Sequence, residues 1–73
     1  MVKSLVLIEG ETLKKENLNI SLKNAKQIVI GHAPQFGWIL HVAANASDDL
    51  GKALLDFAKI PGATSVLPLA LKN

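Results

Sequence analysis

Runs of apolar residues along the chain predict four strands. Residues 2–9, VKSLVLIE, and residues 38–44, WILHVAA, are apolar on both faces in the middle, which is typical of strands in the centre of a sheet. Residues 27–31, QIVIG, predict a shorter strand, and residues 64–71, TSVLPLAL, predict the last one. Because Pro68 has no N–H to donate to a ladder, we expect that last strand at an edge of the sheet.

Residues 47–59, SDDLGKALLDFAK, predict an amphipathic helix. They carry one apolar stripe at helical spacing, which consists of Leu50, Ala53, Leu54 and Phe57. Ser47 is a candidate N-cap, and Gly62 follows shortly after the expected end of the helix.

Residues 11–25, ETLKKENLNISLKNA, fit either a helix or a strand. One helical face is formed by Leu13, Leu18, Leu22 and Ala25. However, Leu18, Ile20 and Leu22 also alternate as they would in a strand, and three asparagines weaken any helix. Between the two, we expect a helix.

The resulting order, β-α-β-β-α-β, predicts an α+β fold of the ferredoxin-like, split βαβ type. Residues 33–37, APQFG, predict the turn between the second and third strands. A single domain over residues 1–73 would then hold a four-stranded antiparallel sheet with two helices on one face. This plan places the first and third strands in the centre, in agreement with their doubly apolar sequences.

The amino-acid composition excludes several classes of binding site and partner. The chain has no cysteine, which excludes disulfides and thiolate metal sites. It also has no arginine, the usual bidentate ligand of phosphate and of base edges, so its net charge of +2 comes from lysine alone. We therefore expect no nucleic-acid partner. The apolar run in MVKSLVLIEG is too short for a signal peptide or a membrane span, so we expect no membrane attachment and a cytoplasmic location.

Both histidines lie in the segment HAPQFGWILHV, but their spacing argues against a metal pair. If His32 lies opposite Trp38 in a hairpin, His41 lies opposite Val29 and the two rings project from opposite faces. If His32 lies opposite Gly37, the rings share a face but are separated by four positions, roughly 13 Å. Neither register brings the imidazoles together on one ion.

Catalytic chemistry has little support in the sequence. Ser65, His41 and Glu9 could be combined into a triad on paper, but no GxSxG turn accompanies them. The chain has no glycine-rich phosphate loop, and no arginine of the kind that acylphosphatases of this fold use to hold phosphate. We therefore expect a protein that is not an enzyme and that carries no cofactor.

The uncovered face of the predicted sheet is a better candidate for the functional site than any catalytic group. Two helices cover one face only, so one alternating set of strand residues must face away from them. One such set consists of Leu5, Leu7, Ile39 and His41, with Lys3 and Glu9 at its margin. An apolar face of this kind marks an interface with a peptide, a protein or a second copy. The edge strand at residues 27–32 offers strand addition as another route.

The sequence resembles a known family over nearly its whole length. The start, VKSLVL, is similar to the first strand of the NapD family, small cytoplasmic chaperones that assemble periplasmic nitrate reductase. Residues 33–72, APQFGWILHVAANASDDLGKALLDFAKIPGATSVLPLALK, resemble the rest of that family's pattern. The shared features are apolar patterning together with Gly37, Pro61 and Gly62.

This resemblance implies a ferredoxin-like chaperone that binds the twin-arginine signal peptide of a molybdenum enzyme precursor on its sheet. Glu9 would then meet the arginines of the peptide, and Leu5, Leu7 and Ile39 would receive its apolar segment. The C-terminal part, IPGATSVLPLALK, also resembles the RAM effector domain of Lrp/AsnC regulators. That resemblance implies a homodimer formed through the sheets that binds amino acids at its subunit interface. A ferredoxin-like domain without any ligand is the third alternative.

Overall fold

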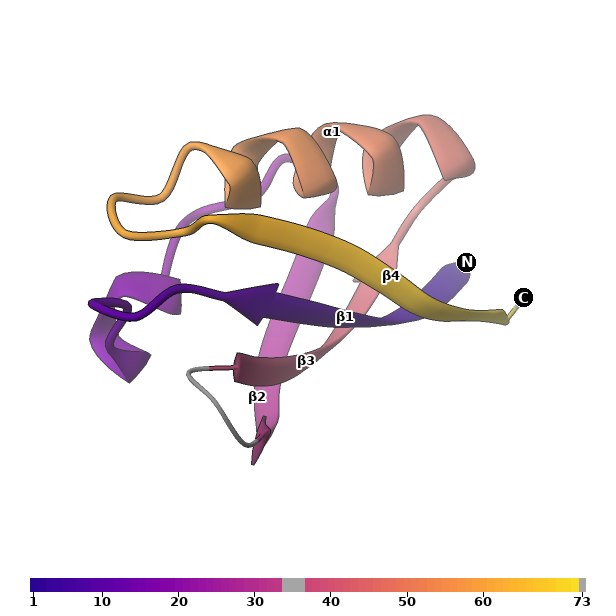
Figure 1. Ribbon diagram of the computed structural model, residues 1–73. Coiled ribbons are helices and arrows are strands. Elements are labelled where there is room, and N and C mark those ends of the chain that lie inside the picture. The colour runs from indigo at the N-terminus through magenta and orange to yellow at the C-terminus, as the bar shows by residue number, and fades with distance from the viewer. Residues whose placement is uncertain (34–36, 73) are drawn as a thin grey trace.

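The computed structural model describes residues 1–33 and 37–72, and the side chains of residues 1–33 and 37–69. The chain forms a four-stranded antiparallel sheet in the order β2-β3-β1-β4, with one α-helix packed against one face (Figure 1). The elements along the chain are β1 (Val2–Glu9), the 3-10 turn η1 (Lys15–Leu18), β2 (Ala25–Ala33), β3 (Gly37–Ala44), α1 (Ser47–Ala58) and β4 (Ser65–Lys72). The predicted α+β class and the central position of the first and third strands are confirmed.

The helix predicted over residues 11–25 is wrong. The structure has only η1 in this part of the chain, and residues 19–24 lead to β2 without a helical turn. The three asparagines lower helix propensity, and Leu18 reaches the core from the short 3-10 turn, where its side chain is 1% exposed. One helix and η1 therefore replace the two predicted helices, while the strand order of the split βαβ plan is kept.

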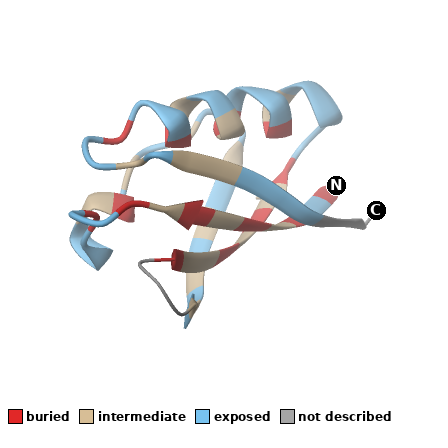
Figure 2. Cartoon of the chain, viewed as in Figure 1, coloured by how far each residue is buried: buried red, intermediate tan, exposed pale blue. Residues whose placement is uncertain are grey.

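The core lies between α1 and the sheet. Along β1 the burial alternates, with Val2, Ser4, Val6 and Ile8 buried (Figure 2). Val6 lies opposite Leu40 in β3, and Ile8 lies opposite Trp38, so the same face of β3 completes the core. These even-numbered positions share one face because successive strand residues point to opposite sides.

The helix α1 follows the predicted apolar stripe, with Leu50, Ala53 and Phe57 buried against the sheet. Its N-cap is Ala46 instead of the predicted Ser47, and the Ala46 carbonyl oxygen accepts from the backbone N–H of Leu50. Ser47 is the first helical residue. None of the helical segments within the described ranges has the length and apolar character needed to cross a bilayer.

Candidate functional site

The sheet face turned away from α1 is called the open face here. It is defined by the odd-numbered residues of the two central strands that carry a side chain, which are Lys3, Leu5, Leu7, Glu9, Ile39, His41 and Ala43. Their even-numbered neighbours form the core, so the alternation leaves these side chains on the far side of the sheet. The sequence predicted every member of this set except Ala43, and the structure establishes that this is the face α1 leaves uncovered.

Two apolar rows cross the open face from one edge of the sheet toward the other. In the first row, Leu5 lies opposite His41, which in turn lies opposite Ile28 of β2. In the second row, Leu7 lies between Ile39 of β3 and Leu67 of β4. Ile28 and Leu67 are 64% and 47% exposed, respectively, so the apolar surface reaches both edge strands.

Charged residues lie at opposite ends of the open face. Glu9 ends β1 at one margin, where its carbonyl oxygen accepts hydrogen bonds from the backbone N–H and the hydroxyl of Thr64 at 2.8 and 3.1 Å. At the other margin, Lys3 and Lys26 both lie opposite Ala43. Since Lys3 and Glu9 are six residues apart on one strand, their Cα atoms are separated by roughly 20 Å. The open face is therefore apolar in the middle, acidic at one end and basic at the other.

The structure brings all five residues predicted to bind a partner onto this one face: Leu5, Leu7, Glu9, Ile39 and His41. Sequence reasoning missed Ile28 and Leu67, which extend the same face. Their alternation within the edge strands was visible in the sequence. The side to which they point depends on the register with β3 and β1, which local spacing does not reveal.

The two histidines project from opposite faces of the sheet. His32 lies opposite Trp38, with ring centroids 4.4 Å apart, on the side where the Trp38 indole N–H donates to the Leu13 carbonyl oxygen. His41 belongs to the open face and lies opposite Ile28, not Val29 as this register predicted. A bulge at residue 30 causes the shift. Of the predicted turn at residues 33–37, residues 34–36 lie outside the described residues.

The groups considered for catalysis and metal binding are not brought together. Glu9 and Ser65 are neighbours across β1 and β4, but His41 lies opposite Leu5, roughly 13 Å along β1 from Glu9. Within residues 1–33 and 37–72, no cluster of three or more histidine, aspartate or glutamate side chains is arranged to hold a metal ion.

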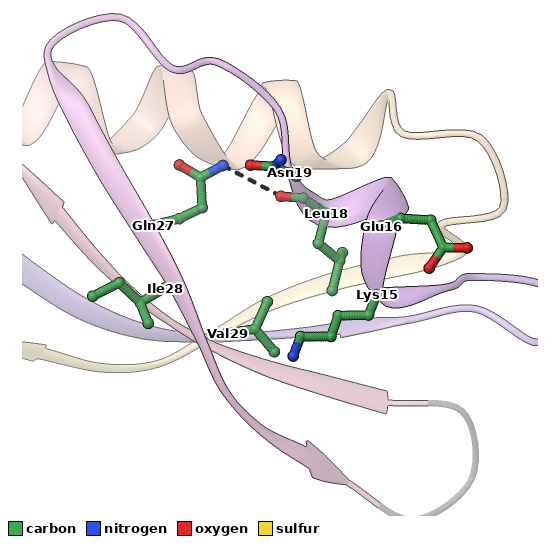
Figure 3. A pocket seen from close by; sticks show the side chains of 7 residues that line it. All are labelled: Lys15, Glu16, Leu18, Asn19, Gln27, Ile28 and Val29. Atoms are coloured by element: carbon green, nitrogen blue, oxygen red, sulfur yellow. Dashed lines mark hydrogen bonds between the residues drawn. The ribbon is translucent and has the colours of Figure 1, made fainter.

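A second concave surface, the β2 groove, runs between η1 and β2 (Figure 3). It has a volume of about 500 Å³ and is lined by Lys15, Glu16, Leu18, Asn19, Gln27, Ile28 and Val29. Ile28 points to the open face, whereas Gln27 and Val29 point to the core side. Because side chains of both faces line the same groove, it lies along the outer edge of β2.

The β2 groove continues toward the start of the strand. A neighbouring hollow of about 410 Å³ is lined by residues 19–22 on one side and residues 25–28 on the other. The predicted helix over residues 11–25 would have covered this part of the sheet. An extended segment leaves a channel in its place.

Comparison of the chain with protein-family models, with curated proteins and with solved structures finds no match. The resemblances to the NapD family and to the RAM domain therefore stay interpretations of the sequence pattern. The open face and the β2 groove are the features on which a function can be argued.

Proposed function

We propose that this protein is a non-enzymatic binding module that holds a peptide on its open face. In this proposal it acts in the cytoplasm as a chaperone for the twin-arginine signal peptide of a molybdenum enzyme precursor. The observation that supports the proposal most strongly is the placement of Leu5, Leu7 and Ile39 on one uncovered face with Glu9 at its end.

The charge arrangement gives the bound peptide a direction. A twin-arginine signal peptide has its basic pair ahead of an apolar segment. The arginines would lie at the Glu9 end, because Lys3 and Lys26 would repel them at the other end. The apolar segment would then run along the Leu7 and Leu5 rows toward the lysines.

Apolar contacts would supply most of the affinity. Full burial of a leucine side chain is worth about 1.5–3 kcal/mol. An exposed ion pair such as Glu9 with an arginine is worth about 0.2–1 kcal/mol. We therefore expect Leu5 and Leu7 to determine how tightly a peptide binds, and Glu9 to contribute selectivity for the basic pair.

The proposal is tested by fluorescence anisotropy with a labelled twin-arginine signal peptide. Leu7→Lys should weaken binding about tenfold or more, whereas Leu55→Lys, at a leucine that is 65% exposed on α1, should not. Glu9→Gln should weaken binding about two- to fivefold, and Glu16→Gln on η1 should leave it unchanged. Replacing both arginines of the peptide by glutamine should reproduce the Glu9→Gln effect.

Three results would contradict the proposal, each in a different part. If Leu7→Lys bound the peptide with unchanged affinity, the open face would not be the peptide-binding site. If the arginine-free peptide bound as tightly as the original peptide, the protein would not be specific for the twin-arginine pair. Measurable hydrolysis of an acyl phosphate by the purified chain would contradict the non-enzymatic part.

One observation favours a second function, a stand-alone effector-binding domain. Lys3 and Glu9 lie at opposite ends of the open face, so two copies packed face to face in antiparallel orientation would place opposite charges together. This alternative predicts a dimer that ignores the peptide and is stabilised by a free amino acid. Thermal unfolding with and without each amino acid, combined with sedimentation in the presence of the peptide, separates the two functions.

A further inference from the structure

We infer that a groove between α1 and β4 binds a small, uncharged molecule that has an aliphatic body and one hydroxyl group. This α1–β4 groove is lined by four residues of α1, by Pro68 and Leu69 of β4, and by Ser4 of β1. It lies on the helix side of the sheet, so it is separate from the open face. The inference therefore does not depend on the function proposed for that face.

The groove is open because β4 slopes away from the first half of α1 (Figure 1). Leu5 pairs with Ala70 and Val6 pairs with Pro68, so Leu69 is an extra residue in β4. A bulge of this kind bends its strand. Proline has no N–H to donate to a ladder, which suits Pro68 to a place beside the bulge. Space consequently remains between the helix and the second half of the strand.

Two small residues keep larger side chains out of this space. The α1 residues of the groove are Ser47, Leu50, Gly51 and Leu54, which recur at the spacing of one helical face. A Cβ at Gly51 would meet no other atom within 4 Å. Ser4 provides the second small side chain, on the core face of β1. The resulting volume is about 480 Å³, within the range of about 300–1,000 Å³ that is typical of small-molecule sites.

The lining of the groove favours an uncharged ligand. Leucine side chains from both elements supply apolar walls, and none of the described residues along the groove is charged. An ionised ligand would lose hydration there without gaining a charged partner. Asp48 and Asp49 follow Ser47 in the first turn of α1, so a carboxylate would also meet like charges at this end. A neutral ligand avoids both costs.

Ser4 supplies a hydrogen-bonding position inside the groove. Its side chain is 3% exposed and lies between Val2 and Val6 on the core face of β1. The Ser4 hydroxyl donates to the Leu5 carbonyl oxygen at 3.1 Å. A hydroxyl oxygen accepts as well as donates, so Ser4 can accept a hydrogen bond from the hydroxyl of a ligand. The aliphatic part of the ligand then lies between the leucines of α1 and β4.

Competition against a fluorescent probe tests the inference. N-phenylnaphthylamine is neutral, and its fluorescence rises when it enters an apolar site. Decanol should displace the probe from the unmodified chain, and decanoate should need a concentration about tenfold higher or more. Equal displacement by the alcohol and the carboxylate would overturn the uncharged class of ligand.

Filling the groove tests the location of the site. Gly51→Leu places a side chain in the groove and should weaken binding of both probe and decanol about tenfold or more. Gly31→Leu adds the same side chain at a glycine of β2 that also faces open space, and it should bind as the unmodified chain does. Circular dichroism verifies that each variant is folded. Unchanged binding by Gly51→Leu, together with loss of binding by Leu7→Lys, would place the ligand on the open face and overturn the inference.

Removing the Ser4 hydroxyl tests its contact with the ligand. Ser4→Ala should weaken decanol binding about two- to tenfold. The same variant should bind decyl methyl ether as the unmodified chain does, because this ether has no O–H to donate. An equal loss for both ligands would contradict the hydrogen bond to Ser4. A chain that binds neither probe nor decanol would overturn the whole inference and would leave peptide binding on the open face unaffected, so the two proposals fail separately.

Discussion

Gln27 and Leu18 are joined by a hydrogen bond in which the Gln27 side-chain amide donates to the Leu18 carbonyl oxygen at 3.3 Å (Figure 3). The same amide nitrogen donates to the carbonyl oxygen of Ile20. Residues 18–20 form no helical ladder, so their carbonyl groups need partners from elsewhere. A polar side chain on the core side of β2 supplies them, and in doing so it fixes the wall of the β2 groove.

Replacing Gln27 tests this connection. Gln27→Met keeps the length of the side chain but removes the donor, and we expect a loss of about 1 kcal/mol in the free energy of unfolding. Lys26→Met, at the exposed neighbouring position, is the control and should change stability little. Urea denaturation measures both. Equal stability of the two variants would show that the amide does not hold the segment.

Gln27→Glu should destabilise the chain more and in a pH-dependent way. A carboxylate facing two carbonyl oxygens is repelled, so the folded state raises the pKa of the introduced carboxyl above its unfolded value. The folded state then binds more protons than the unfolded state, and the stability of the variant should increase as the pH falls from 7 toward 4. Urea denaturation at several pH values, with Gln27→Met as the reference, checks the sign. A flat difference between the two variants would contradict it.

Leu18 anchors η1 in the core. Its side chain is 1% exposed and belongs to the hydrophobic core, so Leu18→Ala would leave a cavity there. We expect a loss of about 2–5 kcal/mol in the free energy of unfolding. Leu55→Ala, at a position that is 65% exposed, should cost less than about 0.5 kcal/mol. A small effect at Leu18 would mean that η1 is not part of the cooperative core.

Two glycines should respond to alanine with opposite signs. A Cβ at Gly10 would collide with the carbonyl oxygen of Gly62, whose φ of +94° fixes the backbone there, so we expect Gly10→Ala to cost about 1–3 kcal/mol or more. A Cβ at Gly51 in α1 meets open space, and Gly51→Ala should raise stability by about 0.5–1 kcal/mol. Thermal unfolding of both variants measures these changes. A loss of stability in Gly10→Ala alone would support the close contact between the backbones at Gly10 and Gly62.

Asn24 has a left-handed backbone with a φ of 58° just before β2 begins. Its carbonyl oxygen accepts from the backbone N–H of Asn45 at 2.9 Å, which links this turn to the end of β3. Asn24→Ala should cost about 1–2 kcal/mol, because alanine lacks the short polar side chain that makes the left-handed region accessible to asparagine. Asn24→Gly should restore most of that loss, because glycine has no Cβ and adopts this region readily. Asp49→Ala removes the long side-chain contact with Asn24 and separates its effect from the backbone effect. Equal losses for alanine and glycine would contradict the backbone explanation.

Local periodicity in the sequence was sufficient to predict the strands, α1 and the grouping of the open-face residues, because periodicity decides which side chains share a face. The alternation of Leu5 and Leu7 with Val6 was sufficient to group them. Pro68 placed the last strand at an edge, and the stripe through Leu50 and Phe57 placed the helix.

The tertiary structure decided those features for which the local sequence pattern favours two alternatives about equally. Residues 11–25 have nearly equal preferences, and contacts of Gln27 and Leu18 across the β2 groove selected an extended path with one 3-10 turn. The bulge at residue 30 shifted His41 to face Ile28. Packing of α1 on one side chose which alternating set is left uncovered. Each outcome depends on pairing between residues far apart in the chain, and no spacing along the sequence encodes that pairing.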